Sequence, residues 1–123
     1  MFPIQSLHHL SFRVPDLADA THFYRDLLGF AEIERPDFGL PGAWLRGFGL
    51  EVHLLAPPGQ QPGAAADGLD PTRNHVAFKV DDLDAVRGRL NEVGVAFLEG
   101  LAGIRQIFVL DPGANVIEFI DPS

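Results

Sequence analysis

Apolar and polar positions recur along the first half of the chain in patterns that predict regular elements. Residues 7–14 are apolar and rich in β-forming residues, which predicts a strand, and Pro15 ends it. Asp16 is a good helix N-cap, and apolar residues then recur at helical spacing as far as Gly29, which suits the left-handed position after a helix. The helical stripe consists of Leu17, Thr21, Tyr24 and Leu28, flanked by Ala20, Phe23 and Leu27.

Three more strands follow in the first half, and we predict them at residues 30–34, 43–46 and 50–56. The segment from Pro57 to Arg73 is then rich in Pro, Gly, Ala and Gln, which is typical of a loop. A loop of this length is either a lid over a site or only a linker.

The pattern starts again after this loop. Residues 75–80 predict a strand, and Asp82 is the N-cap of a helix that ends at Gly94. The apolar positions of that helix are Leu83, Val86, Leu90 and Val93. Further strands are predicted at residues 95–98, 105–110 and 116–120. Between the last two, Pro112 and Gly113 suit the central positions of a type II turn.

The two halves of the chain have similar sequences. HHLSFRVPDL (8–17) matches NHVAFKVDDL (74–83), and LEVHLLAP (50–57) matches NVIEFIDP (115–122). Such self-similarity indicates a duplicated unit, here β-α-β-β-β twice. We therefore predict one domain over residues 1–123, with a first module at 1–57, a linker at 58–73 and a second module at 74–123.

Strand alternation separates an apolar face, expected to pack beneath the helices, from a face with polar residues. On this second face lie His9, His53, His75 and Glu118, one from the first and last strand of each half, and Glu51 shares the face of His53. A single strand histidine is more often hydrogen-bonded or exposed than a ligand. The symmetry of the four favours convergence on one metal ion, because imidazole and carboxylate are ligands for Zn, Ni, Mn and Fe(II).

Two other histidines are interpreted as non-ligands. His8 is expected to point to the face opposite His9, and His22 lies off the apolar stripe of the first helix.

Composition excludes several classes. The net charge is −8 and the nine Lys and Arg residues are scattered, which argues against a nucleic-acid partner. There is no cysteine, so disulfides and thiolate metal sites are excluded. No apolar run reaches the roughly 18 residues that span a bilayer, and the N-terminus lacks the order of a signal peptide. We expect a soluble cytoplasmic protein.

The motifs HLSFRVPDL, FYRDLLGF, VHLLAP, HVAFKVDDLD and DPGANVIEF, taken in order, resemble the vicinal oxygen chelate superfamily. This superfamily includes glyoxalase I, bleomycin-resistance proteins and extradiol dioxygenases. The resemblance implies an α+β fold of two tandem βαβββ modules whose curved mixed sheets form an incomplete barrel around a metal site. It also implies one divalent metal ion, with His9, His53, His75 and Glu118 as its ligands, and a homodimer.

The resemblance further implies that the metal chelates a small oxygenated, anionic substrate and stabilises an enolate-type intermediate. Three imidazoles and one carboxylate leave a divalent ion with a net charge of about +1. We expect a glyoxalase-like lyase or isomerase with Glu118 and His53 as catalytic residues. In glyoxalase I a glutamate stands at the position of His53, and a glutathione-binding asparagine stands at that of Pro57, so the substrate is expected to differ.

Two alternatives stay open. In an extradiol-type dioxygenase, His9, His75 and Glu118 would bind Fe(II), and His53 would act as an acid or base. In a metal-free binding protein of the bleomycin-resistance kind, the cavity would only hold a small molecule.

Candidate substrate contacts lie on strands that would line the cavity. They are Arg13, Trp44, Arg46, Lys79, Arg105 and Phe108. The charged members suit a substrate carboxylate and Trp44 suits an apolar group. Core, rim and surface positions are the competing interpretation for all six.

Overall fold

The chain divides into two compact units, Met1–Pro62 and Gly63–Ser123. The computed structural model describes residues 1–59, 68–100 and 103–123. The division falls within residues 58–73, the segment predicted as a linker. Residues 60–67 of that segment lie outside the described residues, and so does the lid prediction made for them.

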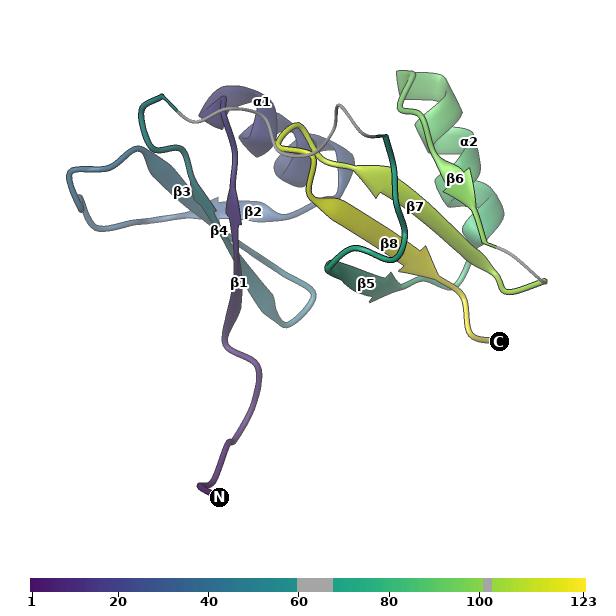
Figure 1. The fold of residues 1–123 in the computed structure, drawn as a ribbon, viewed down its shortest axis with the longest axis horizontal. Coiled ribbons are helices and arrows are strands. Elements are labelled where there is room, and N and C mark those ends of the chain that lie inside the picture. Colours follow the sequence, from purple (N-terminus) through teal and green to yellow (C-terminus); the bar gives the residue numbers. More distant parts are fainter. Residues whose placement is uncertain (60–67, 101–102) are drawn as a thin grey trace. The chain divides into compact units, whose positions relative to one another are not determined.

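The first unit contains a four-stranded mixed sheet and one helical segment (Figure 1). Its elements are β1 (His9–Arg13), α1 (Leu17–His22), the π-helical η1 (Phe23–Leu27), β2 (Ala31–Ile33), β3 (Gly42–Gly47) and β4 (Leu50–Leu55). The strand order is β1-β4-β3-β2. β1 is parallel to β4, and the other neighbours are antiparallel.

The second unit repeats this arrangement. Its elements are β5 (His75–Lys79), α2 (Leu83–Val93), β6 (Leu98–Glu99), β7 (Gln106–Leu110) and β8 (Val116–Ile120). The strand order is β5-β8-β7-β6, with β5 parallel to β8 and the other neighbours antiparallel. The predicted duplication of a βαβββ module is therefore confirmed.

The helix boundaries follow the predicted capping residues. The carboxylates of Asp16 and Asp82 accept hydrogen bonds from the backbone N–H groups of Asp19 and Ala85, both at 3.0 Å. These bonds satisfy N–H groups that have no partner within the helix. Gly94 ends α2 in the left-handed conformation, with φ of 76°, as expected of a glycine there.

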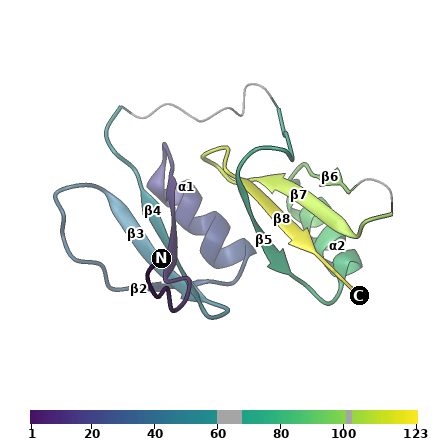
Figure 2. The same cartoon turned by 60° about the horizontal axis from the view of Figure 1, so that its bottom comes forward.

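Each helix covers one face of its own sheet, as Figure 2 shows. α1 packs against β3 and β4, and α2 packs against β7 and β8. Burial follows the predicted strand phase in β1 and β5, where the predicted apolar positions are half-buried and the residues between them are exposed. In β4 and β8 both faces are largely buried, so burial does not distinguish them there. The faces with the candidate ligands are the opposite ones, since side chains alternate along a strand.

Some local predictions were wrong. The last five residues of the first helix form a π-helix, in which the N–H of Leu28 donates to the carbonyl of Phe23. β6 begins at Leu98, so residues 95–97 lie outside the strand predicted at 95–98. Val93, placed on the apolar stripe of α2, is 42% exposed at the end of that helix.

Within the described residues, no helix has the length and apolar character needed to cross a bilayer.

The turn before β8 also differs from the predicted type II turn. Ala114 donates its N–H to the carbonyl of Asp111 at 2.9 Å, and the positive φ belongs to Ala114 (64°) rather than to Gly113. The cause is the buried carboxylate of Asp111, which accepts the backbone N–H groups of Gly113 and Asn115 at 2.8 Å. These bonds hold the loop around Asp111.

Candidate metal centre

His53 and Glu118 occupy the same position in the two equivalent sheets. His53 on β4 pairs with Ser11 on β1, and Glu118 on β8 pairs with Ala77 on β5. Ser11 and Ala77 each lie two residues after the first-strand histidine of their unit. The register therefore places each predicted last-strand ligand beside the predicted first-strand ligand of the same unit.

In the first unit the ring of His53 lies between two other rings. The Trp44 ring stacks on it with centroids 4.3 Å apart and planes at 8°, and the His9 ring stacks on it at 4.0 Å and 15°. His53 is only 8% exposed, whereas His9 is exposed. This packing keeps the plane of the His53 ring fixed and leaves the edges of the ring for polar contacts.

Glu51 occupies one of those edges, and the sequence analysis did not select it. Its Oε1 lies 3.1 Å from Nε2 of His53, and its Oε2 accepts a hydrogen bond from Nη2 of Arg46 at 3.0 Å. The hydrogen bond with His53, and to a smaller extent the one with Arg46, lower the pKa of the Glu51 carboxyl below its usual value. Its place on the ligand face was visible in the sequence, but the repeat gave no support because Val116 stands at the equivalent position.

In the second unit His75 and Glu118 are in direct contact. Nε2 of His75 lies 3.0 Å from Oε1 of Glu118, and Nδ1 lies 2.7 Å from the carbonyl oxygen of Arg73. The other carboxylate oxygen, Oε2, accepts a hydrogen bond from the side-chain amide of Gln106 at 2.9 Å. Glu118 is 4% exposed, and the rings of Phe108 and His75 meet edge to face with centroids 5.7 Å apart.

The chemistry of this second pair fits a cation. A carbonyl oxygen and a carboxylate oxygen only accept, so the imidazole donates Nδ1–H to Arg73 and turns a lone pair on Nε2 toward Oε1 of Glu118. A proton or a metal ion must then lie between these two atoms. Two ligand atoms held about 2.1 Å from an ion, at about a right angle, are roughly 3.0 Å apart. The separation of 3.0 Å between Nε2 and Oε1 matches this distance between two neighbouring ligand atoms.

The structure brings the four predicted ligands together in two pairs, His9 with His53 and His75 with Glu118. Among the described residues, no group of three or more His, Asp or Glu side chains is close enough to hold an ion. The convergence of the two pairs on one ion stays a prediction.

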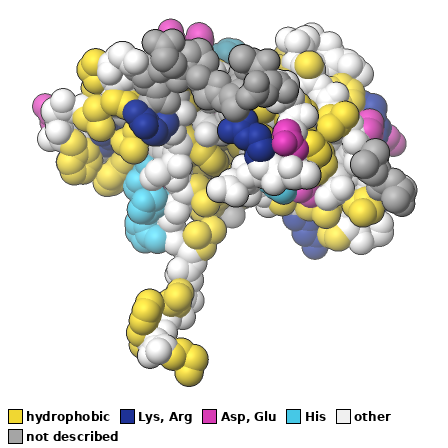
Figure 3. All heavy atoms as spheres, viewed as in Figure 1, with side chains coloured by type: hydrophobic (Ala, Val, Ile, Leu, Met, Phe, Trp, Pro, Cys, Tyr) yellow, Lys and Arg dark blue, Asp and Glu magenta, His cyan; other side chains and the backbone are white. Residues whose placement is uncertain are grey.

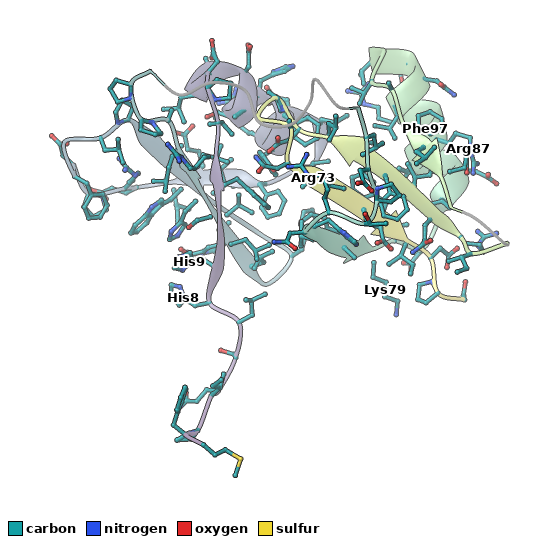
Figure 4. All side chains as sticks on the ribbon, viewed as in Figure 1. His8, His9, Arg73, Lys79, Arg87 and Phe97 are labelled. Atoms are coloured by element: carbon teal, nitrogen blue, oxygen red, sulfur yellow. The ribbon has the colours of Figure 1, made fainter. Side chains whose placement is uncertain are left out.

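The other two histidines behave differently from each other. His22 lies on α1 with Nδ1 2.7 Å from a carboxylate oxygen of Asp26, so its interpretation as a non-ligand stays a prediction. The expectation that His8 points away from His9 is wrong. Their Nδ1 atoms are 2.9 Å apart, and Figure 4 shows both side chains on the same side of the chain. His8 precedes β1, so strand alternation does not apply to it.

A histidine patch is therefore visible on the surface beside β1 (Figure 3). His8 and His9 are both exposed there, and their rings meet edge to face with centroids 5.1 Å apart.

The six predicted substrate contacts have different surroundings. Trp44 stacks on His53, and Phe108 is 6% exposed beside His75. Arg46 is bound to Glu51, and Arg105 donates to the buried Asp121 at 2.8 Å. Arg13 and Lys79 are both exposed at the last residues of β1 and β5, and Lys79 points away from its sheet in Figure 4.

A separate groove of about 680 Å³ lies in the first unit. It is lined by Leu17, by the facing ends of β2 and β3, and by residues of the connection between these strands. It includes none of the predicted ligands or substrate contacts. The structure therefore gives no support for placing the substrate in this groove.

Comparison with known proteins identifies the family. The sequence profile of the Glyoxalase/Bleomycin resistance protein/Dioxygenase superfamily matches residues 6–119. "Glyoxylase I 4" of Arabidopsis thaliana is 31% identical over 94% of this chain and 70% of its own length. An ethylmalonyl-CoA/methylmalonyl-CoA epimerase of Cereibacter sphaeroides is 33% identical over 77% of this chain and 75% of its own.

A solved structure extends the comparison to binding proteins. TnmS3, an antibiotic binding protein from Streptomyces sp. CB03234, superposes with a TM-score of 0.76 over the whole of both chains, at 27% identity. The two curated relatives are enzymes, whereas TnmS3 is described by what it binds. Duplicated βαβββ modules and a matching profile over nearly the whole chain lead to one conclusion: this protein belongs to the Glyoxalase/Bleomycin resistance protein/Dioxygenase superfamily.

Proposed function

We propose that this chain is a metal-dependent lyase or isomerase that acts on a small oxygenated anion. The observation that supports it most is the pair formed by His75 and Glu118. Both oxygen partners of the His75 ring are acceptors, so a proton or a metal ion must lie between Nε2 and Oε1, and the separation of 3.0 Å fits a metal ion.

His9, His53, His75 and Glu118 would hold one divalent ion, which is Zn, Ni, Mn or Fe(II). Three neutral imidazoles and one carboxylate leave such an ion with a charge of about +1, which favours an anionic substrate. When bound, the ion supplies Lewis-acid polarisation of substrate oxygens. The hydrogen bond from His75 to the carbonyl of Arg73 fixes the ring so that Nε2 faces Oε1 of Glu118.

Glu118 is the residue we propose to move the proton. It is buried, the amide of Gln106 holds its Oε2, and its Oε1 faces Nε2 of His75. Oε1 is the oxygen that we propose to accept a proton from a substrate carbon beside a carbonyl, at a stage when it does not bind the ion. The names of the two curated relatives support this choice, since hemithioacetal isomerisation and acyl-CoA epimerisation both move such a proton. His53, held by Glu51 and stacked on Trp44, is the second catalytic candidate.

Trp44 lies on His53 and Phe108 lies beside His75, and both are proposed to contact the apolar part of the substrate. Arg13 and Lys79 are proposed to hold its carboxylate. Arg46 and Arg105 already bind Glu51 and Asp121, so their role in substrate binding rests on the sequence prediction alone. A homodimer and a cytoplasmic location complete the proposal.

The test combines metal content with turnover. Protein prepared without an affinity tag is analysed for metal, then assayed with a glutathione hemithioacetal and with methylmalonyl-CoA. We expect one divalent ion per chain and turnover of one substrate, reduced by at least about 100-fold in Glu118→Gln. The matched control is Glu92→Gln, which changes an exposed glutamate on α2. Full activity after removal of metal, or in Glu118→Gln, would contradict the proposal.

A metal-free binding protein is the second candidate, favoured by the whole-chain similarity to TnmS3. It predicts no uptake of Ni, Zn, Mn or Fe(II) and retention of a small molecule during purification. The dioxygenase alternative predicts activity with Fe(II) alone and consumption of oxygen with a catechol.

A further inference from the structure

We propose that Glu51 is a positioning residue that fixes the tautomer of His53. In this arrangement His53 donates Nε2–H to Glu51 and keeps its lone pair on Nδ1 for the ion. The metal part of this inference rests on the proposed function, whereas the tautomer itself does not.

Arg46 makes Glu51 a residue that can only accept hydrogen bonds. Arg46 on β3 and Glu51 on β4 are register partners, and Nη2 donates to Oε2 at 3.0 Å. Arginine stays protonated, so the carboxylate beside it stays ionised and acts only as an acceptor. The remaining oxygen, Oε1, faces Nε2 of His53 at 3.1 Å and requires a donor there.

The surroundings of His53 fix the plane of its ring, so its polar contacts are made at the ring edge. Trp44 on one face and His9 on the other hold the ring plane, and the residue is 8% exposed. A neutral imidazole has one N–H and one lone pair, so the hydrogen bond at one nitrogen decides which nitrogen can bind a metal.

The second unit holds its first-strand histidine in the opposite tautomer. There, Nδ1–H of His75 donates to a backbone carbonyl and the lone pair lies on Nε2. The position equivalent to Glu51 is Val116, which is 2% exposed and makes no such bond. The lone pair for the ion is therefore on Nδ1 of His53 in the first unit and on Nε2 of His75 in the second. In the first unit an ionised side chain, Glu51, determines this, and the second unit has Val116 in its place.

Glu51 is a positioning residue rather than a further ligand because one of its oxygens is already paired with a cation. Glu118 differs, since its second oxygen accepts from the neutral amide of Gln106. A carboxylate neutralised by a guanidinium attracts a metal ion less strongly than one that is not.

The test reads the tautomer directly in metal-free protein. Long-range ¹H–¹⁵N correlation spectra assign the protonated nitrogen of each histidine in wild type, Glu51→Ala, Glu51→Gln and Arg46→Met. We expect Nε2–H at His53 in wild type and a mixture of tautomers in Glu51→Ala, with His75 unchanged. Glu34→Gln, an exposed glutamate on the same unit, is the matched control and should behave as wild type. Backbone amide spectra establish that each variant is folded.

Metal affinity, measured by competition with a coloured chelator, gives the second readout. Loss of an outer partner of a ligand should weaken binding by about 10- to 100-fold, and His53→Ala should weaken it more. An Nδ1–H tautomer in wild type, or an unchanged tautomer in Glu51→Ala, overturns the inference. So does a loss in Glu51→Ala equal to that in His53→Ala, because Glu51 would then be a ligand. If the tautomers follow Glu51 but no metal binds, the proposed function fails and the inference about Glu51 stands.

Discussion

Trp44 lies flat on His53, with ring centroids 4.3 Å apart and planes inclined by 8°. It is the one tryptophan of the sequence, so its fluorescence reports on the face of a proposed ligand. The sequence predicted Trp44 as a substrate contact and His53 as a metal ligand, each on separate grounds, and the structure brings the two into direct contact.

Metal binding should therefore change the fluorescence of Trp44. We expect Ni²⁺ or Co²⁺ to quench it, with saturation at one equivalent, because an open-shell ion at His53 would lie close to the indole. His53→Gln should remove the saturable part, and His22→Gln, a matched change on α1, should keep it. Quenching that stays linear with added metal in wild type would show collisions in solution instead of a site.

Two glycines should respond in opposite ways to replacement by alanine. A Cβ at Gly42 would lie 2.6 Å from the carbonyl oxygen of Leu54 and 2.8 Å from the guanidinium of Arg35, so Gly42→Ala should destabilise the first unit by about 1–3 kcal/mol. A Cβ at Gly88, within α2, meets nothing within 4 Å, so Gly88→Ala should stabilise the helix by about 0.5–1 kcal/mol.

Urea unfolding followed by circular dichroism and by Trp44 fluorescence checks both changes. Gly42→Ala is expected to lower the midpoint seen by Trp44, which lies two residues away on β3. An unchanged midpoint for Gly42→Ala, or a lowered one for Gly88→Ala, would contradict the local packing described here.

Several features of the fold and site were predictable because each depends on nearby sequence. The caps at Asp16 and Asp82 need only the next three residues, and the equivalence of His53 with Glu118 needs only the repeat. Glu51 was missed because Val116 replaces it in the second module. The direction of His8 was wrongly predicted because β1 begins at His9, so His8 lies outside the strand. The turn at Gly113 was wrongly predicted because the buried carboxylate of Asp111 determines its conformation.

Acid should weaken the second unit through Asp121. The hydroxyl and backbone N–H of Ser123, together with Arg105, lower the pKa of Asp121 from 3.8 to about 2. A carboxyl whose pKa is lower in the folded state binds protons more tightly when unfolded. Its stabilising contribution is therefore complete above about pH 4 and is lost as the pH falls toward 2.

Urea unfolding of wild type and Asp121→Asn between pH 5 and pH 2 tests this. The wild type should lose stability over that range more steeply than Asp121→Asn. Asp26, whose pKa is also lowered to about 2, chiefly by its hydrogen bond with Arg25, should leave some slope in the variant. Parallel curves for the two proteins would mean that the bonds to Asp121 do not persist in solution.

The proposed function requires one ion shared by His9, His53, His75 and Glu118. The most direct measurement is anomalous diffraction from crystals grown with Mn²⁺ or Ni²⁺. We predict one anomalous peak per chain, about 2.0–2.3 Å from a ligand atom of each of these four residues, whether the two modules belong to one chain or to two. A peak bound by only one of the two pairs, or no peak at saturating metal, would contradict it.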